Sequence, residues 1–168
     1  MKEKFIKAYM DVARRFALLS HARRLHVGAI VVKDDRIISI GYNGMPAGWD
    51  NDCEYVEFMP IGDSTAKLED YPLLGNFWIN GHSVERRYRY RTRPEVLHAE
   101  SNAIAKLAKS NDSGEGADLF VTHSPCIECA KLIYQSGIRR VYFGVHYRNN
   151  NGVEFLQKSG VEVTHTPI

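Results

Sequence analysis

Residues 98–104 read HAESNAI, and residues 124–129 read SPCIEC. Each stretch opens a segment with helical character. Apolar side chains recur on one side of residues 98–109, and a second helix is expected over 126–135, ended by Gly137 in a C-cap position. A strand is expected over 118–122 between them. This alternation of helices and strands indicates an α/β protein with both motifs at helix starts.

The flanking segments extend the same pattern. An amphipathic helix is expected over residues 2–20, followed by apolar strands at 27–32 and 37–40 that turn at Asp34-Asp35. Both strands are apolar on successive residues, so we expect them to be covered on both faces. Later segments predict strands at 140–145 and 161–164 with a helix at 152–158. The order predicts a three-layer α/β/α sandwich with a five-stranded mixed sheet.

The length of the chain, 168 residues, fits one domain spanning 1–168. We expect an irregular insertion within it, at about 50–95. Residues 41–51 are a loop rich in turn formers, and residues 52–94 show neither a helical nor a strand period. A segment this long inside a compact domain is usually functional or an interface.

The composition is that of an ordinary globular protein, with 44% hydrophobic and 25% charged residues. A net charge of +2 is too small to indicate a nucleic acid or membrane partner by itself. No uncharged apolar run approaches the ~20 residues of a membrane helix, and charges near the N-terminus break up any signal-peptide core. Three cysteines, two of them in a C-x-x-C pair, argue against a disulfide framework. We therefore expect a soluble, cytoplasmic protein.

The two motifs supply the atoms of a catalytic zinc site. Such a site takes three protein ligands and leaves the fourth position to water. We expect these ligands to be His98, Cys126 and Cys129, because C-x-x-C at a helix start turns both sulfurs to one side. Glu100 cannot easily share a face with His98 as a second ligand, so it is expected beside the water. A closed structural zinc site would need a fourth ligand, and the only spare cysteine, Cys53, is expected to be a buried apolar thiol.

The combination H-x-E with P-C-x-x-C is the known signature of zinc nucleobase deaminases. Zinc bound there would lower the pKa of a water molecule towards neutrality. Glu100 is then expected to take that proton and to pass protons to N3 of cytosine and to the departing amine, while the water oxygen adds to C4. Taken alone, C-x-x-C is often a redox pair or a structural half-site. A zinc-stabilised binding module without catalysis is the alternative.

Matching segments cover almost the whole chain: SxxxR at Ser20 and Arg24, VGAIV at 27–31, GYNGMPAG at 41–48, HAESNAI at 98–104, SPCIECAKLIYQSGI at 124–138 and SGVEV at 159–163. In these segments the chain resembles the deoxycytidylate (dCMP) deaminases of phage and bacterial type, within the cytidine deaminase superfamily. The long segment between Gly48 and His98 also resembles that family, because free-cytidine and tRNA-adenosine deaminases usually bridge this gap more briefly.

The resemblance implies an activity: zinc-dependent hydrolytic deamination of dCMP to dUMP and ammonia, which supplies dUMP for thymidylate synthesis. Such an enzyme is a hydrolase that acts on cyclic amidine C–N bonds. The alternative substrates are another cytosine nucleotide, or cytosine or adenine in a polynucleotide.

The resemblance also implies contacts with the substrate. Asn43 would recognise the nucleoside, although a turn asparagine at positive φ is a rival interpretation in a G-Y-N-G sequence. The Ala99 amide and the Ser124 carbonyl would read the cytosine edge, and Tyr147 would contact the sugar-phosphate. Arg24 is a candidate phosphate ligand, with a merely exposed basic residue as the equal alternative.

Regulation is a further implication. Members of the family commonly form hexamers that are activated by dCTP with Mg²⁺ and inhibited by dTTP. The G-x-P-x-G loop resembles part of that regulatory site, at Gly44, Pro46 and Gly48. Some members hold a second, structural zinc. Here Cys53 and His82 are the available ligands, but Arg23 stands where phage members can have cysteine, which argues against a second zinc.

One basic segment stands out from an otherwise acidic chain. Its five arginines are interleaved with Tyr88 and Tyr90, and subtracting them takes the formal charge from +2 to −3: Arg86, Arg87, Arg89, Arg91 and Arg93. Aromatic and basic residues interleaved in this way are typical of single-stranded nucleic acid binding. However, Glu85 and Glu95 flank the run. We expect an interface or a mononucleotide-phosphate role, ahead of a solvated helix face or a polynucleotide site.

Overall fold

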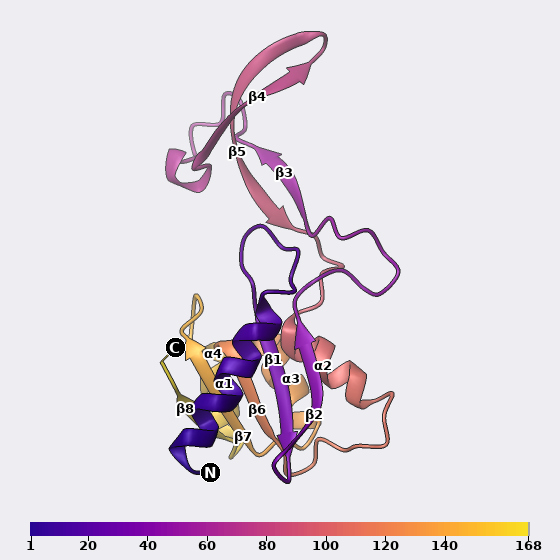
Figure 1. Ribbon diagram of the computed structural model, residues 1–168. Coiled ribbons are helices and arrows are strands. Elements are labelled where there is room, and N and C mark those ends of the chain that lie inside the picture. Colours follow the sequence, from indigo (N-terminus) through magenta and orange to yellow (C-terminus); the bar gives the residue numbers. More distant parts are fainter. Residues whose placement is uncertain (168) are drawn as a thin grey trace.

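A mixed five-stranded sheet forms the centre of the computed structural model, which describes residues 1–167 (Figure 1). The strand order is β2-β1-β6-β7-β8, with the bounds β1 Gly28–Lys33, β2 Arg36–Tyr42, β6 Asp118–His123, β7 Arg140–Val145 and β8 Glu162–His165. Strands β2, β1 and β6 are antiparallel neighbours, whereas β6, β7 and β8 run parallel. The predicted five-stranded mixed sheet is confirmed.

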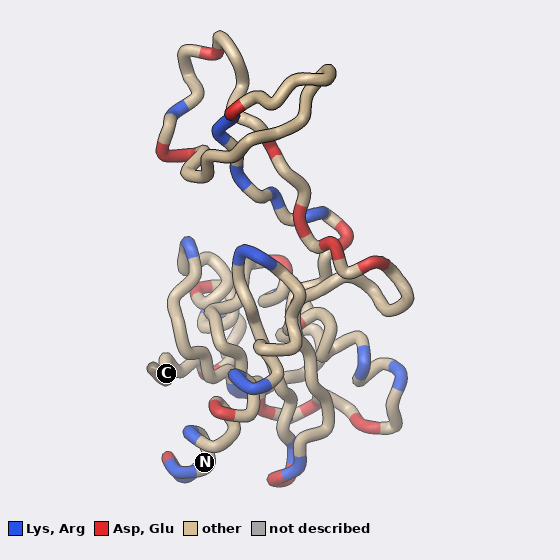
Figure 2. The backbone as a smooth tube through the Cα atoms, turned by 45° about the horizontal axis from the view of Figure 1, so that its top comes forward, with Lys and Arg blue, Asp and Glu red and all other residues tan. Residues whose placement is uncertain are grey.

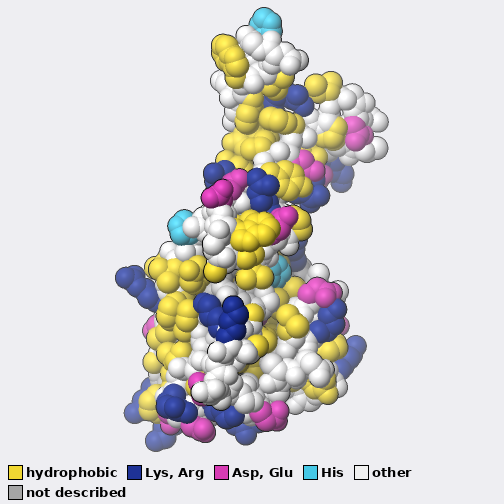
Figure 3. All heavy atoms as spheres, turned by 90° about the vertical axis from the view of Figure 1, so that its right-hand side faces the viewer, with side chains coloured by type: hydrophobic (Ala, Val, Ile, Leu, Met, Phe, Trp, Pro, Cys, Tyr) yellow, Lys and Arg dark blue, Asp and Glu magenta, His cyan; other side chains and the backbone are white. Residues whose placement is uncertain are grey.

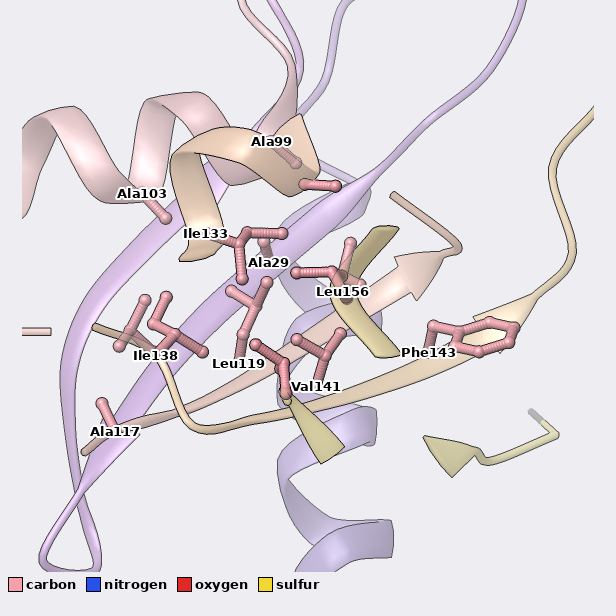
Figure 4. Close-up of a cluster of buried hydrophobic side chains, with 14 of the residues drawn as sticks. Ala29, Ala99, Ala103, Ala117, Leu119, Ile133, Ile138, Val141, Phe143 and Leu156 are labelled. Carbon is pink, nitrogen blue, oxygen red and sulfur yellow. The ribbon is translucent and has the colours of Figure 1, made fainter. Parts of the chain in front are cut away.

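Helices cover both faces of this sheet. One face packs against α1 (Glu3–Ala17), in a cluster that includes Met10, Ile30 and Phe120. The opposite face is covered by α2 (Ala99–Leu107), α3 (Ile127–Gln135) and α4 (Asn151–Lys158) (Figure 1). Figure 4 shows the larger cluster on that side, where Ile133 and Leu156 lie over Leu119 and Val141. These two apolar layers confirm the predicted three-layer sandwich.

Gly28 opens β1 directly beneath the backbone of α1. A Cβ atom there would lie 2.0 Å from the Ala13 carbonyl oxygen and 2.5 Å from the Ala17 nitrogen. Backbone atoms of a packed helix cannot swing aside, so we expect Gly28→Ala to lower the free energy of unfolding by about 1–3 kcal/mol or more. Urea denaturation measures this loss. Gly44→Ala is the matched control, because a Cβ there meets nothing within 4 Å; equal losses in both variants would contradict the steric explanation.

Residues 54–92 form a second sheet, which we call the arm. It consists of β3 (Glu54–Phe58), β4 (Leu73–Ile79) and β5 (His82–Thr92) in the antiparallel order β3-β5-β4, with a short 3-10 helix, η1, at Leu68–Asp70. Figure 1 shows the arm extending away from one end of the core. The prediction of an irregular insertion is therefore wrong. The strands of the arm contain almost no fully buried position, and β4 alternates only between half-buried and exposed residues, so the strand period in its sequence is weak.

The basic segment is part of strand β5, so a solvated helix face is excluded for it. Its arginines are largely engaged within the arm and its base. Arg89 and Arg91 both pair with Glu57, and Arg86 donates to the Met59 carbonyl oxygen over 2.9 Å. Arg93, just beyond β5, pairs with an Asp52 carboxylate oxygen at 2.8 Å. Three of the five arginines are therefore paired with carboxylates of the chain itself, and the segment is not a wholly free basic stripe.

The predicted hairpin turn is confirmed, since Asp34 and Asp35 both have positive φ values, of 50° and 57°, as a two-residue turn between antiparallel strands requires. Across residues 1–167, no helix has both the length and the apolar character that crossing a bilayer would take.

Candidate active site

Helix starts position the three expected metal ligands. His98 is the N-cap residue of α2, Cys126 is the N-cap residue of α3, and Cys129 lies in the first turn of α3. A helix N-terminus carries a partial positive charge, which stabilises thiolate anions. The placement therefore favours the ionised cysteines that a metal requires.

The ligand atoms lie close enough to share one ion. The Nδ1 atom of His98 is 3.5 Å from the Cys126 sulfur and 3.3 Å from the Cys129 sulfur, and all three atoms lie within 4.8 Å of one another. A tetrahedral ion with Zn–S near 2.3 Å and Zn–N near 2.0 Å would space its ligands by roughly 3.5–3.8 Å. Within residues 1–167, no other His, Cys, Asp or Glu joins this group. The donor set fits zinc with one open position.

The cluster divides its protons unevenly when no metal is present. The pKa of the Cys126 thiol falls to about 3, because Cys129 and then His98 donate hydrogen bonds to its sulfur. The same hydrogen bond to Cys126, together with burial, raises the pKa of Cys129, and the pKa of His98 also rises, chiefly through Cys126. The pair thus favours ionisation of Cys126 over Cys129, and a bound cation would displace the proton of Cys129.

Glu100 is buried beside this cluster, with 4% of its surface exposed. Burial raises the pKa of its carboxyl to about 7, although its own backbone amide and His98 act in the opposite direction. A group with a pKa near the working pH can both accept and donate a proton. Glu100 therefore has the protonation behaviour expected of a single carboxyl that acts first as a base and then as an acid.

A cavity of about 400 Å³ opens onto these residues. Its lining includes two of the expected metal ligands, His98 and Cys126, and the expected acid–base residue, Glu100. It also includes all five residues predicted to contact substrate: Arg24, Asn43, Ala99, Ser124 and Tyr147. Cys129 lies behind this lining, almost fully buried. The structure thus brings the predicted residues to one site, and their individual roles stay predictions.

Asn43 does not have a positive φ, so the interpretation as a left-handed turn residue is wrong. Its side chain instead holds a neighbouring segment: Oδ1 accepts from the Val27 amide and Nδ2 donates to the Leu25 carbonyl, both over 2.8 Å. Leu25 and Val27 also line the cavity. Asn43 therefore fixes part of the wall, and its contact with a nucleoside stays a prediction.

The base of the arm supplies wall residues that the sequence did not indicate. The buried Glu54 carboxylate accepts hydrogen bonds from the backbone amides of Arg23 and Arg24, over 3.0–3.3 Å. Thr92, paired with Glu54 across the two strands, accepts from the Arg24 guanidinium over 2.9 Å. Glu54 and Thr92 both line the cavity. Arg24 is thereby held at the rim by a residue 68 positions away in the chain.

A second arginine at the rim also escaped prediction. Arg148 lines the cavity, is exposed, has a φ of 42° and lies over the Tyr147 ring at 5.0 Å. The backbone amide of Tyr147 donates to the Ser124 hydroxyl over 2.8 Å, which anchors this loop to the motif before Cys126. Figure 2 shows basic stretches on loops of the core at the end from which the arm rises. Other unpredicted lining residues include His123, Val145 and His146.

The arginines of the basic segment do not reach this cavity, since none of Arg86, Arg87, Arg89, Arg91 and Arg93 is among its lining residues in the described chain. Arg93 instead lines a separate cavity of about 550 Å³ beside the G-x-P-x-G loop, together with Met45, Gly48, Trp49, Asp50, Asp52 and Glu95. Pro46 supports this loop by accepting a hydrogen bond from the Trp49 amide, while Gly44 pairs with Leu97.

Three N and S ligands with an open fourth position, next to a buried carboxyl group, define a zinc-dependent hydrolytic centre. A family model described as the cytidine and deoxycytidylate deaminase zinc-binding region matches residues 2–145. The chain therefore belongs to the cytidine and deoxycytidylate deaminase family.

Individual relatives agree with this assignment. The deoxycytidylate deaminase of Enterobacteria phage T4 is 35% identical over 153 residues, which cover 84% of this chain and 79% of that protein. ComE operon protein 2 of Bacillus subtilis is 33% identical over 161 residues, covering 95% and 70%. The crystal structure of dCMP deaminase from cyanophage S-TIM5 in complex with dCMP and dUMP is similar at a TM-score of 0.76 and 40% identity, covering 99% of each chain.

Proposed function

We propose that this chain catalyses the zinc-dependent hydrolytic deamination of dCMP to dUMP and ammonia. The observation that carries the proposal is a single cavity with His98, Cys126 and the buried Glu100 in its wall and two arginines, Arg24 and Arg148, among its lining. The first group suits the chemistry at a cytosine ring, and the second suits a 5′-phosphate. The similarity to phage dCMP deaminases supports the same substrate.

In the proposed reaction, His98, Cys126 and Cys129 would hold zinc, which when bound lowers the pKa of a water molecule towards neutrality. Glu100 accepts a proton from water and delivers one to N3 of the cytosine ring as the water oxygen bonds to C4. Glu100 then takes the second proton from the oxygen now bonded to C4 and passes it to the amino group, so that the C4–N bond breaks, the C4=O bond forms and ammonia leaves. Ala99 and Ser124 line the cavity, which supports the proposal that the Ala99 amide and the Ser124 carbonyl pair with the base.

A substrate panel tests the proposal. We expect kcat/KM to be highest for dCMP when dCMP, CMP, deoxycytidine, dCTP and a cytosine-containing oligonucleotide are assayed side by side. Preference for deoxycytidine or for the oligonucleotide would overturn the substrate assignment. Zinc binding without turnover of any of the five compounds would instead favour a zinc-stabilised binding module.

The two rim arginines are expected to act through the phosphate. Arg148→Ala and Arg24→Ala should each lower kcat/KM for dCMP about tenfold or more, because hydrogen bonds with charged partners contribute roughly 1.5–3 kcal/mol. The rate with deoxycytidine, which lacks the phosphate, should change little. Arg15→Ala, on the exposed side of α1, is the matched control. Equal losses for dCMP and deoxycytidine would show that the arginines support the fold of the rim rather than the phosphate.

We also propose that the separate cavity beside Gly48 takes a regulatory nucleotide, with dCTP as activator and dTTP as inhibitor. Its lining offers Arg93 for a phosphate group and the carboxylates of Asp50, Asp52 and Glu95 for Mg²⁺, a cation that prefers oxygen ligands. Repeating the substrate panel with each effector tests this. Unchanged dCMP kinetics with both nucleotides would contradict it.

We propose in addition that residues 1–168 form one domain. We further propose that this domain assembles into a homo-oligomer, namely a hexamer. Light scattering on the purified protein measures this directly. A cytoplasmic location is part of the proposal, because cysteine ligands must stay reduced to bind metal.

A further inference from the structure

The arm contains almost no core of its own. Within residues 54–92, only Glu54 and Tyr71 are buried. One face carries a row of aromatic rings in edge-to-face contact, with centroid distances from 4.7 to 5.6 Å, formed by Phe58, Phe77, Tyr88 and Tyr90. Small isolated sheets are marginally stable in water unless a face is packed. The arm therefore exposes apolar surface that a binding partner would bury.

The most exposed of these surfaces is the outer edge of β4. This strand is last in the sheet order, and its outer side has no strand and no backbone hydrogen bond in the part of the chain that the structure describes. Leu74 is 55% exposed and Trp78 is 78% exposed. Figure 3 shows hydrophobic side chains along the arm, which stands clear of the core. Space for another strand is thus available beside β4.

The composition of β4 favours strand pairing. Its seven residues, LLGNFWI, include no charge and no proline. Natural edge strands usually carry charges, prolines or bulges that prevent pairing with another chain. The opposite edge, β3, carries a charged residue at Glu57. The β4 edge has no such protection, which indicates that another strand pairs with it.

We propose that β4 pairs antiparallel with β4 of a second copy of this chain, across a two-fold axis at Asn76. The two arms then form one continuous six-stranded sheet. The interface deepens the self-association proposed above, on which it rests, and it takes no part in the bond-making and bond-breaking steps of deamination. A two-fold pairing of identical edges closes on itself, whereas pairing of β4 with β3 of the next copy would continue without end and place carboxylates along the seam.

The register at Asn76 sets uncharged residues of the two copies opposite each other. It places Leu74 opposite the partner's Trp78 on one face, and Gly75 opposite the partner's Phe77 on the other. Within one arm the rings of Phe77 and Tyr88 already lie 3.2 Å from where a Gly75 Cβ would be, so aromatic rings cover this glycine. No position along the paired edges carries a charge, so like charges never face each other.

Engineered disulfides test the pairing. In the proposed register Asn76 faces its own copy at a Cα separation of about 4.5–5.5 Å, within the range that a disulfide spans. We expect Asn76→Cys to form a covalent dimer under mild oxidation, seen on non-reducing gels. Ser83→Cys, on the neighbouring strand, is the matched control, because three strand spacings of about 14 Å would separate its two copies. An Asn76→Cys protein that stays monomeric on the gel overturns the proposal.

A charge at the axis provides the second test. Asn76→Lys would place two ammonium groups opposite each other, and we expect its mass by light scattering to be half that of the wild type or less. Ser83→Lys should leave the mass unchanged. Circular dichroism and dCMP turnover check that both variants are folded. An Asn76→Lys protein with the wild-type mass contradicts the interface while leaving self-association intact, whereas a monomeric wild type contradicts both.

Discussion

Glu100→Gln is expected to lower kcat for dCMP by about 10²- to 10⁴-fold, the range in which a positioned acid–base group contributes. Glutamine has nearly the same shape as glutamate, but its amide neither accepts nor releases a proton near neutral pH. The zinc ligands themselves are unaltered, so the variant should keep one zinc ion per chain. Steady-state kinetics and elemental analysis of the purified protein measure the two quantities.

Glu128→Gln is the matched control for this result. Glu128 is an exposed residue next to Cys129 in α3 and pairs only with Lys131 among the described residues, so its substitution should leave kcat within about twofold. Loss of zinc together with activity in Glu100→Gln would show that the carboxylate holds the metal site together. Retention of full activity would exclude Glu100 as the group that transfers protons.

Cys129→Ala is expected to lose both zinc and activity. Two ligands would remain at His98 and Cys126, and the hydrogen bond that first lowers the pKa of the Cys126 thiol would disappear with the Cys129 sulfur. Zinc at a hundred times its Kd stabilises a folded protein by about 2.7 kcal/mol, so a chelator should lower the thermal midpoint of the wild type. The same chelator should leave the midpoint of Cys129→Ala unchanged.

Cys53→Ala separates loss of a ligand from loss of a cysteine. Cys53 is buried but lies outside the ligand cluster, so this variant should lose some stability through packing yet retain zinc and respond to the chelator. One zinc ion per chain in Cys129→Ala would contradict the assignment of this residue as a ligand.

The sequence predicts the core well because every core element has at least one face packed against another layer. The apolar stripe of α1 and the continuous apolar run of β1 each follow from a layer packed against them, and the turn at Asp34-Asp35 follows from local backbone preferences. The arm lacks such a layer. Its strands contain almost no fully buried residue, and the pairing of β3 with β5 joins residues 30 to 38 positions apart. No local pattern records that pairing.

The residues of the candidate site also fall into two groups: those that a local sequence pattern indicates and those that only the tertiary fold brings to the cavity. The ligands and Glu100 are grouped by short spacings at two helix starts, which is why the motifs indicate them. Glu54, Thr92 and Arg148 reach the cavity only through the tertiary fold, and each is a single polar residue with no neighbouring pattern. The interpretation of Asn43 as a turn residue failed because its side chain bonds across to Leu25 and Val27, which sequence spacing does not reveal.

The contact of Glu54 with the amides of Arg23 and Arg24 links binding of a partner at the arm to binding of dCMP in the cavity. Glu54 is the first residue of β3 and so belongs to the arm. Its carboxylate also fixes the backbone of Arg24, the proposed phosphate ligand. We therefore expect a partner bound to the arm to affect the rim of the cavity, and a coupling free energy of this kind is equal in both directions. Under the proposed β4 pairing, dilution that separates the copies would weaken dCMP binding, and saturating dCMP would strengthen the association.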